Sequence, residues 1–102
     1  MTPQDKVNTL DDLKWSSSHK VGDITISIIQ GKGCVGKRLS RTFEVWIWDS
    51  IGDIPYKGQF DVEMTTNPFV IYDCDLLYLI KQIELDPQGW VKKQRDAFNE
   101  LG

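Results

Sequence analysis

KVGDITISIIQGKGCVGKRLSRTFEVWIWD, residues 20–49, decides the predicted fold, because it joins two β-rich runs through a loop punctuated by glycines. Apolar and other residues alternate along both runs. One face of each run is formed by Ile24, Ile26 and Ile28 in the first and by Phe43, Val45 and Ile47 in the second. This period of two is typical of β-strands, so the stretch predicts a long β-hairpin.

The residues on either side of this hairpin predict three helices and up to two further strands. Thr2, Pro3 and Asp5 have the form of a helix start, and the predicted first helix ends near Trp15, before a run of serines. Residues 59–66 alternate again and predict a third strand, and residues 69–72 are a candidate fourth. Residues 74–85 predict a largely buried helix. A last helix is predicted to begin at Asp86 and Pro87.

Together these elements predict one α+β domain over residues 1–102, in the order α-β-β-β-α-α. Short connections favour a three-stranded antiparallel meander, with the candidate fourth strand extending it. Helices are expected to cover one face of the sheet. The residues predicted on that face are Ile24, Ile26, Ile28, Phe43, Val45, Ile47, Phe60, Val62 and Met64. Of these, we expect Val45 and Phe60 to be deeply buried.

The charge and composition of the chain exclude several classes of protein. A formal net charge of -3 disfavours nucleic acid as a partner, because phosphates are met by an excess of Lys and Arg. The polar start of the chain and the lack of a long apolar run predict no secretory signal and no membrane partner. Two cysteines do not form a disulfide framework. We therefore expect a cytoplasmic protein.

The glycine loop matches two nucleotide-binding motifs in part. Gly31, Gly33 and Gly36 satisfy G-x-G-x-x-G, and Arg38 stands where a P-loop has its magnesium-binding hydroxyl. Both motifs need a helix that begins in the loop, whereas a β-rich run follows here. Nucleotide is thus disfavoured. A weaker anion-binding role remains open for this loop, and its residues are Gly31, Lys32, Gly33, Gly36, Lys37 and Arg38.

Catalytic and metal-binding constellations are not evident in the sequence. His19 is the single histidine, and no second one is present to share a metal ion. Acid pairs such as Asp61 and Glu63 are typical of a solvated strand face. We expect no catalytic residue, no metal and no cofactor, and an enzyme is only the third interpretation of the chain.

Two tryptophans give the sequence its most specific candidate site. If Val45 faces the helices, Trp46 and Trp48 project from the opposite face of the strand. Exposed aromatic residues on a rigid strand are typical of interfaces. The predicted partner-binding residues are Trp46, Trp48, Glu44, Asp61 and Glu63. The alternative, that residues 1–15 fold over these indoles, stays open.

The leading hypothesis is a small, acidic, non-enzymatic binding protein that uses this sheet face. Its partner would be a second copy, giving a homodimer, or a basic macromolecule. The general character of the chain is similar to small accessory proteins of mobile gene cassettes, phages and toxin-immunity loci. The alternative function is small-ligand binding between sheet and helices. The predicted ligand pocket is lined by Trp15, Trp46, Trp48 and Tyr56.

Overall fold

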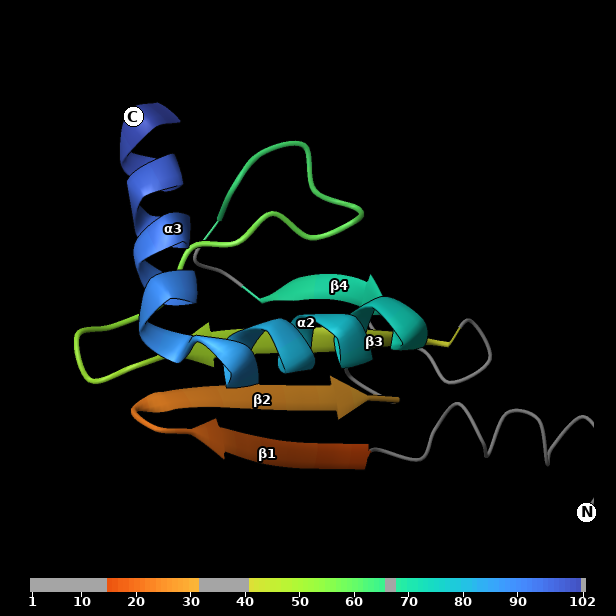
Figure 1. Ribbon diagram of the computed structural model, residues 1–102. Coiled ribbons are helices and arrows are strands. Elements are labelled where there is room, and N and C mark those ends of the chain that lie inside the picture. The colour runs from red at the N-terminus through yellow and green to blue at the C-terminus, as the bar shows by residue number, and fades with distance from the viewer. Residues whose placement is uncertain (1–14, 32–40, 66–67, 102) are drawn as a thin grey trace, which may run out of the picture.

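The computed structural model describes residues 15–31, 41–65 and 68–101, and within them it shows a four-stranded antiparallel sheet and two helices (Figure 1). The elements are β1 (Trp15–Val21), β2 (Ile24–Gln30), β3 (Thr42–Trp48), β4 (Phe69–Tyr72), α2 (Asp73–Leu85) and α3 (Pro87–Leu101). The strands lie in the order β1-β2-β3-β4. This confirms the α+β class and the antiparallel meander, with residues 69–72 as its last strand.

Strand β1 was not predicted, and it begins at Trp15, where the predicted first helix was expected to end. Residues 1–14 lie outside the described residues, and from Trp15 onward the chain is a strand paired with β2. Gly22 has φ of 58°, and Val21 pairs with Ile24 across the two-residue turn Gly22–Asp23. Left-handed glycine is typical of such tight hairpin turns. The turn and the apolar partner β2 therefore make a strand of a serine-rich segment with little strand preference of its own.

The predicted third strand over residues 59–66 is wrong for its described part. Residues 59–65 belong to the connection between β3 and β4, and Thr65 makes only an isolated bridge with Tyr56. The Asp61 carboxylate accepts a hydrogen bond from Gly58 N at 3.2 Å, and Asp61 N donates to Gly58 O. Such local bonds compete with strand pairing.

The connection also covers the outer edge of β4. Gln59 Oε1 accepts a hydrogen bond of 2.7 Å from Tyr72 N, which satisfies a backbone donor at this edge. Figure 1 shows the connection arching beyond β4. The edge that residues 59–65 would have needed for pairing is therefore occupied by Phe69–Tyr72.

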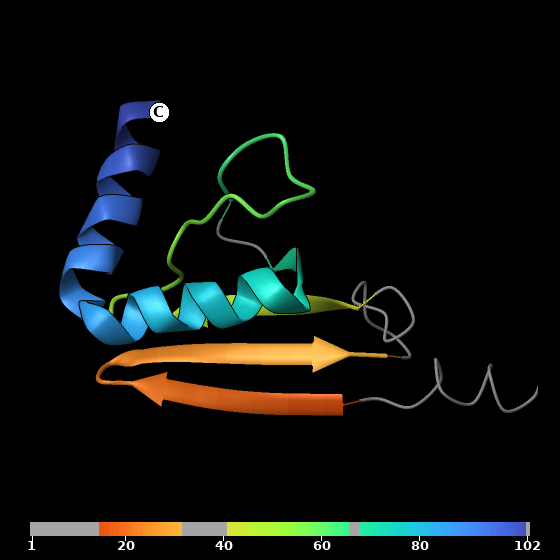
Figure 2. The same ribbon diagram turned by 45° about the vertical axis from the view of Figure 1, so that its right-hand side comes forward.

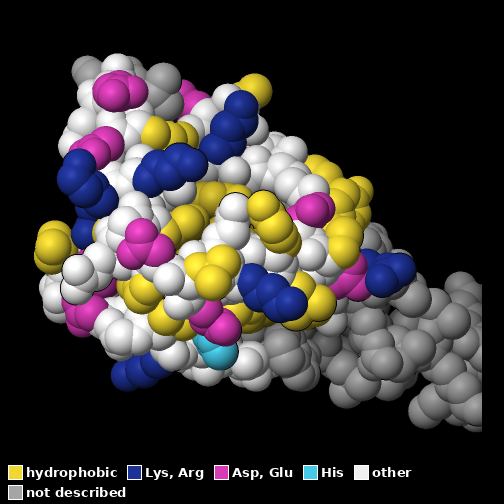
Figure 3. Space-filling model, viewed as in Figure 1, with side chains coloured by type: hydrophobic (Ala, Val, Ile, Leu, Met, Phe, Trp, Pro, Cys, Tyr) yellow, Lys and Arg dark blue, Asp and Glu magenta, His cyan; other side chains and the backbone are white. Residues whose placement is uncertain are grey.

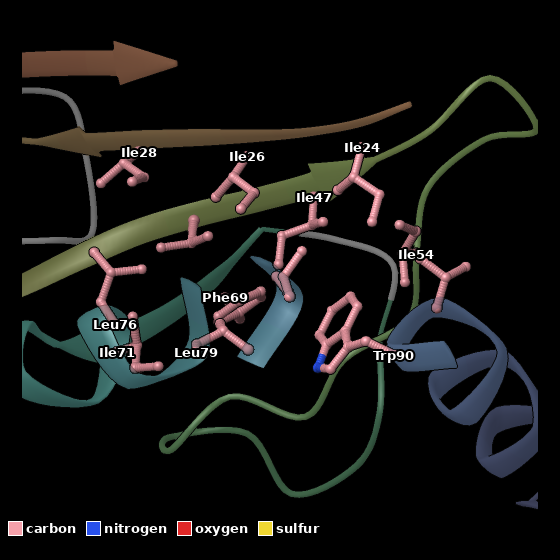
Figure 4. Close-up of a cluster of buried hydrophobic side chains, with 13 residues drawn as sticks. Ile24, Ile26, Ile28, Ile47, Ile54, Phe69, Ile71, Leu76, Leu79 and Trp90 are labelled. Atoms are coloured by element: carbon pink, nitrogen blue, oxygen red, sulfur yellow. The ribbon is translucent and has the colours of Figure 1, made fainter. Parts of the chain in front are cut away.

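The hydrophobic core lies between the sheet and α2. Alternate residues of β2, β3 and β4 meet the buried residues of α2 there (Figure 4). The buried set is Ile24, Ile26, Ile28, Val45, Ile47, Ile54, Phe69, Ile71, Leu76, Leu79, Ile83, Trp90 and Val91. Val45 is buried as predicted. Phe60 and Val62 are 54% and 94% exposed, so their predicted place in the core is wrong.

The two helices differ in how much of their length is buried. Helix α2 runs along the strands and buries Leu76, Leu79 and Ile83 on one stripe. Helix α3 turns away from the sheet (Figure 2), and its buried residues, Trp90 and Val91, lie near its start. Neither helix, over its described residues, is long and apolar enough to cross a membrane.

Candidate functional site

The side of the sheet opposite α2, which we call the open face, is formed by the alternate residues of each strand. Cross-strand pairs lie on the same face, so the register defines its members. They are Ser16, Ser18 and Lys20 of β1, Thr25, Ser27 and Ile29 of β2, Thr42, Glu44, Trp46 and Trp48 of β3, and Val70 and Tyr72 of β4; among them Thr42 is buried. Neither described helix packs on this face, because both contribute their buried residues to the core on the other side.

Trp46 and Trp48 stand side by side on the open face, in the half of β3 that pairs with β2 but not with β4. Their ring centroids are 6.1 Å apart, and the ring planes meet at 76°, the edge-to-face arrangement that aromatic pairs favour. Trp46 is 43% exposed and Trp48 is half-buried. Strand β3 lies between β2 and β4, so the indoles project from a central strand.

Asp53 joins this pair, although the sequence did not single it out. Its Oδ1 accepts a hydrogen bond of 2.9 Å from Trp46 Nε1, and its backbone forms an isolated bridge with Trp48. The turn after β3 brings it there, because Asp49 N donates to Gly52 O and Ile54 N donates to Ile47 O. The aspartate and glycine of the sequence D-S-I-G-D were the available signal for this turn.

A hollow of about 280 Å³ lies over these side chains and is lined by Trp46, Trp48 and Asp53. A smaller hollow of about 30 Å³ shares Trp46 and is also lined by Ser27, Ile29 and Glu44 of the same face. The nearest acids are thus Glu44 and Asp53. The basic residue of the described open face is Lys20, on the outer strand.

The predicted acidic surround is only partly assembled. Glu44 lies on the open face, two residues from Trp46. Asp61 and Glu63 instead belong to the connection beyond β4, where Asp61 bonds to Gly58. Their placement on a strand beside the indoles depended on the strand over residues 59–66, so Asp53 takes the place expected for them.

The predicted ligand pocket draws on residues from opposite sides of the sheet. Tyr56 lies on the helix side, with its ring centroid 4.6 Å from Phe69 and 5.9 Å from Trp90. Burial, together with the Asp75 carboxylate, raises the pKa of its hydroxyl. Trp46 projects from the open face, so the structure does not bring these two together. Trp15 begins β1 opposite Gln30, and its side chain is outside the described part.

The candidate anion-binding loop falls largely outside the described residues. Gly31 directly follows β2, is buried and has φ of 107°, a conformation that favours glycine. Lys32, Gly33, Gly36, Lys37 and Arg38 are not described.

A second, larger hollow of about 450 Å³ lies where α3 begins beside the turns after β1 and β3. Ile24, Ile51 and Val91 supply apolar lining. Arg95 donates two hydrogen bonds of 2.8 Å to the Asp49 carboxylate, whose side chain is 9% exposed. These bonds hold the pKa of Asp49 below its ordinary value, against the opposing effect of burial. Asp23 Oδ2 accepts from Ser50 N and Oγ at 3.1 and 2.6 Å.

Groups suited to a metal ion do not occur in the described part of the chain, where no three His, Cys, Asp or Glu side chains cluster. His19 projects to the helix side of β1 and lies 3.1 Å from the Glu84 carboxylate of α2. Around α2, Figure 3 shows hydrophobic side chains interspersed with charged ones.

No family model, curated protein or solved structure matches this chain.

Proposed function

We propose that this protein is a non-enzymatic binding protein that holds a basic segment of a protein partner on its open face. The observation that carries the proposal is the edge-to-face pair of Trp46 and Trp48 on a central strand, next to Asp53. An indole fixed in this way loses little conformational freedom when a partner covers it, which favours binding.

The energetic scale of such a contact supports a specific complex. Burying an aromatic side chain contributes about 1.5 to 3 kcal/mol by area alone. Two tryptophans thus supply the kind of anchor that dominates many interfaces. Glu44 and Asp53 add negative charge beside this anchor, and complementary charge speeds the encounter with a basic segment.

The test compares two double variants, each of which removes two large apolar side chains. Trp46→Ser with Trp48→Ser alters the open face, and Leu77→Ser with Tyr78→Ser alters the outer side of α2, where both residues are 65% exposed. Binding to a lysine-rich peptide is measured by calorimetry, and mass is measured by sedimentation.

We expect the parent and the α2 variant to bind the peptide and the tryptophan variant to lose binding while it still folds cooperatively. Equal binding by all three proteins would overturn the proposal. If the parent forms a dimer that depends on the tryptophans and does not bind the peptide, the partner is a second copy of the chain.

A second candidate function is the binding of a small ligand, and the 450 Å³ hollow beside α3 favours it. Apolar walls with a few fixed polar groups are typical of ligand sites, and its volume lies in their range. A thermal-shift screen of metabolites tests this function. Ile51→Ser is a suitable variant because Ile51 lines the hollow and is 83% exposed, so its loss affects the fold little. A hit whose shift persists in this variant would place the ligand elsewhere.

A further inference from the structure

The hollow over Trp46, Trp48 and Asp53 has walls of two different chemical kinds. The two indole planes meet at 76° and so form a corner of aromatic surface. The carboxylate of Asp53 stands at the same hollow, and Asp53 is exposed to solvent. A ligand group in this corner therefore meets aromatic rings and a negative charge together.

The bond between Asp53 and Trp46 fixes how the carboxylate is presented. Oδ1 accepts the Trp46 Nε1 hydrogen at 2.9 Å. Among the described residues, no donor bonds to the other oxygen, Oδ2, which is left for a ligand. An ionised carboxylate only accepts hydrogen bonds, so the group it selects is a donor, and its charge favours a cation.

Aromatic faces select for the same kind of group. The face of an indole ring carries negative electrostatic potential, and tryptophan is the best aromatic partner for an ammonium group. Anions are disfavoured by both the rings and the carboxylate. The geometry points to a subsite in which Trp46, Trp48 and Asp53 bind the ammonium group of a lysine side chain on a protein partner.

The shape of the surface favours lysine over arginine. An ammonium group is compact and fits a corner between two rings, whereas a planar guanidinium stacks best on a single ring face. The adjoining small hollow shares Trp46 and is lined by Ile29 and Ser27. Ile29 and the Trp46 ring offer apolar surface along which the methylene stem of a lysine packs while its charged end bonds elsewhere.

This inference rests on the proposed function, since it names the anchoring group of the basic partner. It is tested with short peptides that carry one central lysine, or norleucine as its neutral counterpart. Choline is a third probe, which distinguishes a free quaternary ammonium ligand from a lysine. Each probe is titrated into ¹⁵N-labelled protein while the indole Nε1 signals of Trp46 and Trp48 are followed.

We expect saturable shifts of both indole signals with the lysine peptide, and about tenfold weaker binding of the norleucine peptide. Asp53→Asn retains an oxygen that accepts from Trp46 Nε1 but removes the charge, so it is expected to weaken lysine binding several-fold. Glu63→Gln removes an exposed acid from the connection beyond β4 and is expected to leave binding unchanged.

Equal binding of the lysine and norleucine peptides, or no effect of Asp53→Asn, would overturn the inference. Stronger binding of choline than of the lysine peptide would also overturn it, in favour of a small quaternary ammonium ligand. If binding to the lysine-rich peptide still depended on Trp46 and Trp48 in these cases, the proposed function would stand without a lysine subsite.

Discussion

The ion pair between Asp49 and Arg95 is expected to be a main support of the turn after β3. The Asp49 carboxylate accepts four hydrogen bonds: two from Arg95, and two from the backbone N–H groups of Ile51 and Gly52 at 3.0 and 3.2 Å. Arg95 Nη2 also donates to Gly52 O at 3.3 Å. This geometry ties the middle of α3 to residues 49–52.

The expected cost of breaking the pair follows from its burial. The Asp49 and Arg95 side chains are 9% and 24% exposed, so solvent screens their interaction only in part. Hydrogen bonds to charged groups stabilise a protein by about 1.5 to 3 kcal/mol. Asp49→Asn retains one oxygen for the backbone donors, and we expect it to lower the free energy of unfolding by about 2 kcal/mol. For a chain of this size that lowers Tm by about 8 to 16 °C.

A double-mutant cycle measured by urea unfolding tests this expectation. Arg95→Met keeps an apolar stem, and the double variant is expected to lose about 1 to 2 kcal/mol less than the sum of the single losses. Asp96→Asn is the matched control, because the Lys92–Asp96 pair lies on the same helix with side chains 77% and 55% exposed. Additive losses in the cycle, or an equal loss in the control, would refute the argument.

The pH dependence of the same variants gives an independent check. The pKa of Asp49 is lowered in the folded protein, first by the hydrogen bonds from Arg95. The resulting stability is present above the ordinary pKa of the carboxyl group and is lost as pH falls through the folded pKa. The gap between the parent and Asp49→Asn should therefore be constant from about pH 5 to 7 and narrow below about pH 4. A gap that is unchanged at pH 3 would contradict this assignment.

Further predictions concern the core and the turns. Phe69→Ala should lower the free energy of unfolding in urea by about 3 to 5 kcal/mol, because Phe69 is 3% exposed. Phe60→Ala should lower it by only about 1 kcal/mol, because Phe60 is 54% exposed and its ring contacts that of Tyr72. Equal losses would show that the assignment of buried and exposed phenylalanines is wrong. Gly58→Ala should lower Tm through overpacking, because its added Cβ would lie 2.8 Å from Phe69 Cβ. The Cβ added by Gly22→Ala would meet no atom within 4 Å, so the expected loss of about 1 to 2 kcal/mol in the free energy of unfolding comes from backbone strain alone. Gly22→Asn should lose less, because asparagine adopts this left-handed conformation more readily than alanine.

The elements predicted correctly from the sequence are those with strong apolar periodicity. Strands β2 and β3 follow the alternation of Ile24 to Ile28 and of Phe43 to Ile47, and α2 follows the helical spacing of its leucines and isoleucines. In each case the apolar stripe is long enough for burial to decide the local structure. The same alternation predicted that Trp46 and Trp48 lie on the opposite side of β3.

The errors arose where tertiary pairing outweighed local pattern. The alternation of Phe60, Val62 and Met64 is as regular as that of β3, yet the edge it needed is taken by β4. The serine-rich β1 has no apolar alternation, and only its Gly22–Asp23 turn marks it as a hairpin strand. Asp53 was missed because its place beside Trp46 depends on how a turn folds back, which residue spacing alone does not specify.

The turn after β3 links the stability of the fold to the candidate site. Asp53 follows Gly52, whose carbonyl accepts bonds from Asp49 N and from Arg95. Loosening this turn frees the carboxylate that holds the Trp46 indole. Arg95→Met lies outside the Trp46–Trp48–Asp53 hollow but should therefore weaken binding of the lysine peptide as well as stability. Asp96→Asn, one residue along α3, should change neither the binding nor the stability. If Arg95→Met binds the lysine peptide as the parent does, at a temperature where the variant is folded, the turn and the site are independent.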